Sequence, residues 1–106
     1  MAREATEIEI TTIGRRTGEG HSHPVWFVRD GGATYLLPVG GSGSQWYRNL
    51  RKNPTIKLGD NSAKAKLITD RSKVNEVVQD FSGKYGASDV KKYYPGIDVA
   101  VEVQTS

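Results

Sequence analysis

Cysteine is absent from the 106-residue sequence. Its absence excludes a disulfide scaffold, a thiolate zinc site and a cysteine nucleophile. No apolar run is long enough to span a bilayer, and the polar first ten residues lack the apolar stretch of a signal peptide. We therefore expect a soluble, cytoplasmic protein that does not associate with membranes.

The sequence also lacks a charged tail. Its net charge is +3, from 15 basic and 12 acidic residues, and both signs are spread evenly over the two halves of the chain. A strongly basic arm for nucleic acid is thus missing. With 36% hydrophobic residues and only 2 Trp, 5 Tyr and 2 Phe, the chain can build one modest core. We expect a single domain over residues 1–106.

Short alternating runs of apolar residues predict β-strands along much of the chain. Glycines at 31–32 and the turn at 59–62 each indicate a hairpin between two such runs. Pro38 confines the end of its run to a sheet edge or a bulge, because proline has no N–H group to donate. The six predicted strands cover residues 8–13, 23–29, 34–39, 55–58, 63–68 and 97–103.

Three helices are predicted between these strands. Ser44 can cap a helix over 45–52, and Asp70 can cap the longest helix, which Gly83 and Gly86 break before a weaker helix at 87–94. The longest helix carries an apolar stripe made of Val74, Val77, Val78 and Phe81. These elements predict an α+β fold that is mainly β, a six-stranded antiparallel barrel closed by its two terminal strands with the helices outside.

Two glycine-rich loops are the first candidates for a binding site. The loop at 14–20 has three glycines and places Arg15, Arg16 and Thr17 side by side. Glycines let backbone N–H groups approach an anion, and guanidinium groups supply permanently charged, forked donors. The loop therefore predicts a phosphate or carboxylate ligand, although a solvated hairpin loop explains the same residues. Neither this loop nor the loop at 40–44 has the spacing of a P-loop or a dinucleotide fingerprint.

His21 and His23 lie two residues apart at the start of a predicted strand, so both project from the same face. We expect no metal there, because a stable site needs three or four ligands and no carboxylate stands at ligand spacing. By pattern alone, Trp26 and Trp46 are predicted core residues, and the tyrosines near the C-terminus are predicted packing or surface residues.

The order of these motifs carries a resemblance that no single motif has. Thr-Thr-Ile-Gly-Arg-Arg-Thr-Gly at 11–18 precedes His-Pro-Val-Trp-Phe-Val-Arg-Asp-Gly-Gly at 23–32, Gly-Gly at 40–41 and Trp-Tyr-Arg-Asn-Leu-Arg-Lys-Asn-Pro at 46–54. This series resembles the deazaflavin-dependent nitroreductase family, over about residues 10–103. The resemblance implies a flavin-binding split β-barrel that holds coenzyme F420, an 8-hydroxy-5-deazaflavin with a phosphate and an oligoglutamate tail.

The resemblance also implies which residues bind the cofactor. The first glycine-rich loop would hold the anionic tail. The segment 21–26 would run along the cofactor, with Pro24, Val25 and Trp26 beside the ring. Trp46 would close the other side of the ring, with Trp26 the more deeply buried tryptophan. The proton that the reaction also needs is expected from Tyr85, as the candidate catalytic residue, from one of the two histidines, or equally from water. The implied cofactor-binding residues are Arg15, Arg16, Thr17, His21, His23, Pro24, Val25, Trp26, Val39, Gly40, Gly41, Trp46, Tyr47 and Asn49.

The leading functional prediction is an oxidoreductase that transfers a hydride between F420 and an electron-poor small molecule, such as a quinone, an enone or a nitro compound. An FMN-binding split barrel would use the same loop at 14–20, which we call the arginine loop, for the single phosphate of FMN. A small basic β domain that binds single-stranded nucleic acid is a third interpretation, but a net charge of +3 is small for that role, so we expect no nucleic-acid partner. The sequence is also compatible with a carrier that binds F420 without catalysing a reaction. It is compatible with a homodimer as well.

Overall fold

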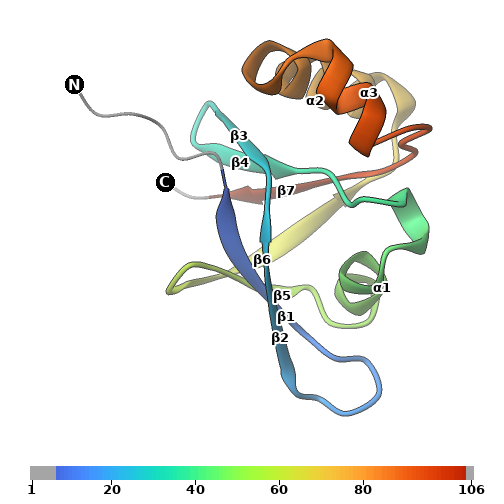
Figure 1. The fold of residues 1–106 in the computed structure, drawn as a ribbon. Helices are drawn as coiled ribbons and strands as arrows, with labels where there is room; N and C mark the ends of the chain where they lie inside the picture. The colour runs from blue at the N-terminus through green and yellow to red at the C-terminus, as the bar shows by residue number, and fades with distance from the viewer. Residues whose placement is uncertain (1–6, 105–106) are drawn as a thin grey trace.

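The computed structural model describes residues 7–104 (Figure 1). Along this part of the chain, β1 (Ile8–Ile13), β2 (Gly20–Val25), β3 (Phe27–Asp30) and β4 (Ala33–Leu36) come first. A 3-10 turn η1 (Gly41–Gly43) and the helix α1 (Gln45–Lys52) follow, and then the hairpin of β5 (Thr55–Leu58) and β6 (Asn61–Ile68). The helices α2 (Arg71–Tyr85) and α3 (Ala87–Tyr93) lead to the last strand, β7 (Ala100–Gln104).

These strands form one antiparallel sheet in the order β2-β1-β5-β6-β7-β4-β3. The two outermost strands, β2 and β3, follow each other in the chain with only Trp26 between them, so the sheet curls into a split barrel (Figure 1). The predicted fold class is confirmed. The predicted closure by the terminal strands is wrong, because β1 lies between β2 and β5, and β7 lies between β6 and β4.

The sheet has seven strands rather than the predicted six because the run at 23–29 is divided. The chain leaves β1 as its partner after Val25 and takes β4 as its partner from Phe27 onwards. The boundaries of the other strands differ less from the predicted ones. β6 begins at residue 61, directly after a two-residue turn in which Gly59 has a φ of 60°. β4 ends before Pro38, and β7 begins three residues later than predicted.

Apolar residues on the two faces of β3, β4 and β7 belong to different cores. Phe27 and Leu36 pack inside the barrel, whereas their neighbours Val28 and Tyr35 pack outside it. This explains why all four residues of β4 are buried. The inner core includes Trp46, Tyr47 and Leu50 of α1, and the outer core includes Val74, Val77 and Phe81 of α2. The predicted apolar stripe of α2 therefore packs on the sheet, except that Val78 is only partly buried.

The helices begin where the sequence predicts them. Asp70 caps α2 by accepting a hydrogen bond from the N–H group of Lys73 at 3.0 Å, whereas Ser44 makes no side-chain cap to α1. The predicted break at Gly83 is wrong, since α2 continues to residue 85 and ends at Gly86, whose φ is 98°. A single glycine inside a helix, such as Gly83, lowers the stability of the helix without ending it.

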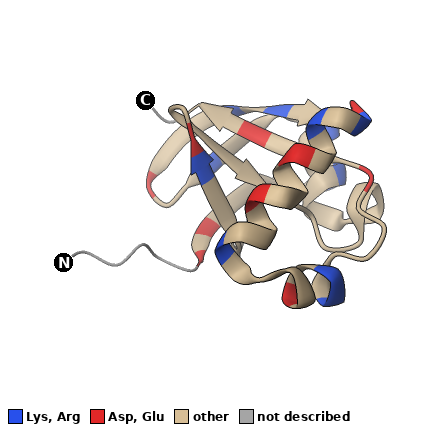
Figure 2. Cartoon of the chain, turned by 90° about the horizontal axis from the view of Figure 1, so that it is seen from above, with Lys and Arg blue, Asp and Glu red and all other residues tan. Residues whose placement is uncertain are grey.

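The charged residues of both signs are interspersed over the helices and strands in the view of Figure 2. A nucleic-acid-binding domain would present a face on which basic residues are clustered. The view in Figure 2 shows no such face. Among residues 7–104, no helix is long and apolar enough to cross a membrane.

Candidate functional site

The loop at 14–19 joins β1 to β2 and has a fixed backbone. The N–H group of Gly14 donates to the carbonyl of Glu19 at 2.7 Å, and the N–H group of Gly18 donates back to the carbonyl of Gly14 at 2.9 Å. The ring of His21 lies so close to Gly14 that a Cβ atom there would stand 2.7 Å from its Nε2 atom. Gly14 is therefore the residue that lets His21 lie against the loop.

Arg15 ties the loop to α1. Its Nη1 atom donates to the side-chain oxygen of Asn49 at 2.8 Å, and its Nη2 atom donates to the side-chain oxygen of Gln45 at 2.8 Å. Lys52 donates to the backbone carbonyl of Arg15 at 3.2 Å. Partial burial, together with the charges of Arg48 and Arg16, lowers the pKa of the Arg15 guanidinium. Arg15 therefore positions the loop against one face of α1, and the exposed Arg16 does not share these bonds.

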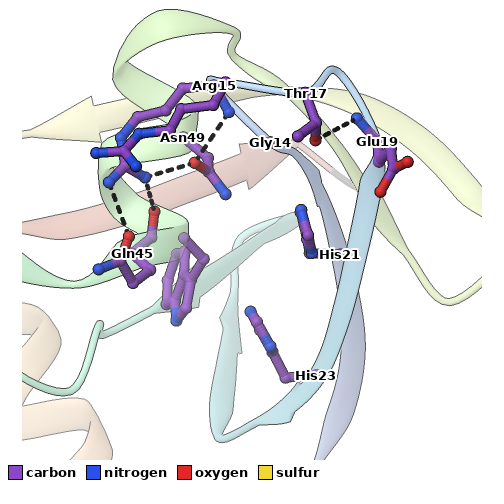
Figure 3. A pocket seen from close by; sticks show the side chains of 10 residues that line it. Gly14, Arg15, Thr17, Glu19, His21, His23, Gln45 and Asn49 are labelled. Carbon is purple, nitrogen blue, oxygen red and sulfur yellow. Dashed lines mark hydrogen bonds between the residues drawn. The ribbon is translucent and has the colours of Figure 1, made fainter.

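A cavity of about 440 Å³ lies between this loop, β2 and α1 (Figure 3). We call it the cationic cavity. His21 and His23 both point into it, as their predicted shared face requires. The Nε2 atom of His23 is buried and has no hydrogen-bond partner among the described residues. The lining residues are Gly14, Arg15, Arg16, Thr17, Glu19, His21, His23, Gln45, Trp46 and Asn49.

A second cavity, of about 330 Å³, shares Trp46 with the cationic cavity as a lining residue, and we call it the aromatic cavity. Two of its lining residues are exposed although apolar or aromatic, Val39 by 62% and Tyr93 by 47%. Burial raises the pKa of Tyr94, which also lines this cavity, to about 12, with the nearby Tyr85 adding to the shift. The lining residues are Glu7, Pro24, Val25, Trp26, Leu37, Val39, Trp46, Tyr93 and Tyr94.

Trp46 is more deeply buried than Trp26, which reverses the prediction. Trp46 is 7% exposed and belongs to the inner core, whereas Trp26 is only half-buried. The prediction failed because Trp26 stands at the junction between two strands, outside the inner core. Trp46 lines both cavities while filling the core.

The second glycine-rich loop is held by an aspartate from the other end of the chain. The Oδ1 and Oδ2 atoms of Asp98 accept hydrogen bonds from the N–H group and the hydroxyl of Ser42, at 3.0 and 2.7 Å. These bonds hold the pKa of the Asp98 carboxyl below its usual value. A Cβ atom at Gly41, where φ is 62°, would collide with the same carboxylate. Gly40, Gly41 and Tyr47 line neither cavity.

Tyr85, the predicted proton donor, also lines neither cavity. Its ring is stacked on that of Trp26, with 4.1 Å between the ring centroids and an interplanar angle of 7°. Its hydroxyl group bonds to the backbone of Phe27. The structure thus places Trp26 between Tyr85 and the aromatic cavity.

Several lining residues were not among the predicted site residues. Gln45 has a signal that could have revealed it, because it lies four residues before Asn49 on α1 and so shares its face. Tyr93 and Tyr94 are predicted packing or surface residues, and nothing in the local pattern brings α3 to the segment at 24–26. Leu37 and Glu7 carry no motif at all. Across residues 7–104, no three potential ligands among His, Cys, Asp and Glu stand together as a metal site would require.

Comparison with solved structures shows the same fold in other proteins. One solved structure of the same fold is an F420-H2 dependent reductase, with a TM-score of 0.65 and 17% identity, covering 92% of this chain and 93% of that one. Another is an F420 reductase, with a TM-score of 0.58 and 19% identity over 95% of this chain and 86% of that one. A third is a domain-swapped dimer, with a TM-score of 0.69 and 16% identity over 95% and 81% of the two chains.

The family model of the F420H2-dependent quinone reductases matches residues 3–104. That match spans nearly the whole chain, including the arginine loop, both histidines and α1, and it confirms the resemblance seen in the sequence. The chain belongs to the F420H2-dependent quinone reductase family.

Proposed function

We propose that this protein binds reduced coenzyme F420 across the two cavities that meet at Trp46, and that it directs a hydride from the cofactor to a quinone. One observation carries the proposal: two cavities share Trp46 as a lining residue, one of them lined by guanidinium groups and the other by aromatic rings. A cofactor with an anionic tail and a flat tricyclic ring needs both a cationic cavity and an aromatic wall. Membership of the family supports F420 as the cofactor and reduction as the reaction.

The residues of the cationic cavity fit an anionic, hydrogen-bonding group. The buried Nε2 atom of His23 has no partner among the described residues, and a buried polar atom gains free energy when a ligand satisfies it. Both terminal nitrogens of Arg15 already donate to α1. Arg16 is therefore the guanidinium that we assign to the phosphate or the glutamate tail, with Thr17 beside it.

The aromatic cavity suits the ring system. Trp26 and Trp46 line it from different elements, and Pro24, Val25 and Leu37 complete an apolar wall. These side chains would orient the ring and exclude water from the carbon that carries the hydride. When bound, reduced F420 supplies that hydride from its C5 atom, and the protein contributes binding and orientation.

A quinone also needs a proton to become a hydroquinone. His21 and His23 line the cationic cavity, and Tyr85 lines neither cavity. We therefore assign that proton to a water molecule in the aromatic cavity, or to a histidine of the adjoining cationic cavity, and not to Tyr85. Enones and nitro compounds accept a hydride by similar chemistry and remain further candidate substrates.

Binding of F420 tests this assignment through its fluorescence. We expect Arg16→Glu to weaken F420 binding about tenfold or more, because it replaces a charge-assisted hydrogen bond with repulsion. Lys64→Glu makes the same change of charge at an exposed position of β6 outside both cavities, so it should leave the affinity nearly unchanged. Equal effects of the two substitutions would remove Arg16 from the site.

Binding of FMN provides the second comparison. The arginine loop alone could hold one phosphate, but the cationic cavity continues along α1 to Gln45 and Asn49. We expect F420 to bind more tightly than FMN and to displace it. An FMN that copurifies and resists displacement by F420 would replace our assignment with the FMN alternative.

A further inference from the structure

The hydroxyl group of Tyr85 makes hydrogen bonds to the backbone of the edge strand β3, as a neighbouring strand would. It accepts a hydrogen bond from the N–H group of Phe27 at 3.0 Å and donates one to the carbonyl of Phe27 at 2.9 Å. Phe27 pairs with Leu36 of β4 on its other side, so these two groups lie along the outer edge of β3. An edge strand needs such partners for its backbone, and α2 supplies them from 58 residues away.

Lys84 strengthens the same attachment. Its ammonium group donates to the carbonyl of Phe27 at 2.8 Å and lies 3.7 Å from the centroid of the Phe27 ring. Two consecutive residues at the end of α2 therefore hold the backbone of one residue, Phe27, at the point where the chain passes from β2 to β3.

The ring of Tyr85 meets Trp26 face to face, while α3 bounds Trp26 on other sides. Tyr93 makes an edge contact with Trp26 at 5.5 Å between centroids, and Tyr94 makes a tilted contact at 6.0 Å. Trp26, Tyr93 and Tyr94 all line the aromatic cavity, and Tyr85 does not. Tyr85 thus fixes both the ring of Trp26 and the backbone immediately after it.

We propose that Tyr85 is a positioning residue, which sets the indole of Trp26 as a wall of the aromatic cavity and does not donate a proton to the substrate. The proton of its hydroxyl is used in the bond to the Phe27 carbonyl, and Trp26 separates its ring from the cavity. The inference rests on the proposed function in one respect, namely that the cofactor ring lies beside Trp26.

Fluorine NMR tests the positioning role in the protein without cofactor. Protein labelled with 5-fluorotryptophan gives one signal for each of its 2 tryptophans, and Trp26→Phe identifies the signal of Trp26. We expect Tyr85→Phe, which keeps the stacked ring and removes the hydroxyl bonds to Phe27, to shift or broaden the Trp26 signal and to leave the Trp46 signal in place. Tyr35→Phe is the matched control, because Tyr35 belongs to the same outer core and lies on β4.

Binding and kinetics then separate positioning from proton donation. We expect Tyr85→Phe to weaken F420 binding by about two- to tenfold, the effect of a lost hydrogen bond, while kcat with a quinone and its pH profile stay within about twofold of wild type. Lys84→Met, which removes the other bond to the same carbonyl, should move the Trp26 signal in the same way. Lys84→Met also provides the test if Tyr85→Phe does not fold.

Two results would overturn the proposal. One is a Trp26 signal that neither substitution changes. The other is a fall in kcat of about 100-fold or more for Tyr85→Phe with unchanged F420 affinity, which is the loss expected when a general acid is removed. Failure of the wild-type protein to bind F420 would instead refute the proposed function, and the fluorine spectra would still decide whether Tyr85 positions Trp26.

Discussion

Arg15 and Asn49 are 34 residues apart in the sequence and share two hydrogen bonds, since the guanidinium and the backbone N–H group of Arg15 both donate to the Asn49 side-chain oxygen. Asn49 in turn donates to the hydroxyl of Thr12 at 3.3 Å. One buried amide therefore connects α1, β1 and the arginine loop.

Removal of that amide should destabilise the protein. We expect Asn49→Ala to lower the free energy of unfolding by about 1–3 kcal/mol, because it leaves polar groups of Arg15 and Thr12 without their partner. Urea denaturation measures the change. Arg48→Ala removes an exposed side chain of the same helix and should change the free energy by less than about 0.5 kcal/mol. An Asn49→Ala protein as stable as wild type would show that the amide is dispensable.

Trp46 should be the more costly tryptophan to remove. Because it is 7% exposed within the inner core, Trp46→Ala should lower the free energy of unfolding by about 3–5 kcal/mol. Trp26→Ala, at the half-buried residue, should cost less. Thermal and urea denaturation of both variants provides the comparison. The reverse order, or a loss of F420 affinity without a loss of stability in Trp46→Ala, would return Trp46 to a role as a cavity wall alone.

Gly83 inside α2 and Gly86 directly after it should respond in opposite directions when each is replaced by alanine. Nothing lies within 4 Å of a Cβ atom built at Gly83, so Gly83→Ala should stabilise the protein by about 0.5–1 kcal/mol through a less flexible unfolded chain. Gly86 ends the helix at a φ of 98°, which L-residues rarely adopt. Gly86→Ala should therefore destabilise it by about 1–3 kcal/mol. Paired denaturation curves decide, and effects of the same sign would contradict the helix end described here.

The bond between Asp98 and Ser42 should make stability depend on pH. The folded protein lowers the pKa of Asp98 through these hydrogen bonds, so its contribution is present above the ordinary carboxyl pKa of about 3.9 and is lost as the pH falls through the lower folded value. Wild type should exceed Asp98→Asn in stability at neutral pH, and the difference should shrink below about pH 4. A difference that stays constant from pH 7 to pH 3 would contradict this reading.

The sequence predicted those parts of the fold that local patterns determine. The ranges of β1, α1 and β5, and the Asp70 cap, followed from apolar spacing and from short polar signals. The division of the strand at Trp26 did not, because the backbone of Phe27 is bound by Tyr85 and Lys84, far away in the chain. No neighbour of Phe27 in the sequence carries that information.

The candidate site shows the same limit. The cations and histidines that line the cationic cavity were visible as residue types in a glycine-rich segment. The separate roles of the two arginines could not be predicted, since only the fold shows that Arg15 is bound to α1. The contact by which Asp98 holds the loop at Gly41 was equally hidden in the sequence. The aromatic cavity was hardest to foresee, because it joins α3 to the segment at 24–26.

Anaerobic oxidation of reduced F420 by a short-chain quinone, followed through the fluorescence of the oxidised cofactor, tests the central claim most directly. We predict a rate that is proportional to protein concentration, that saturates with F420H2, and that falls in Arg16→Glu but not in Lys64→Glu. A rate no faster than that of the mixture without protein, or an equal rate with reduced FMN in place of F420H2, would contradict the account.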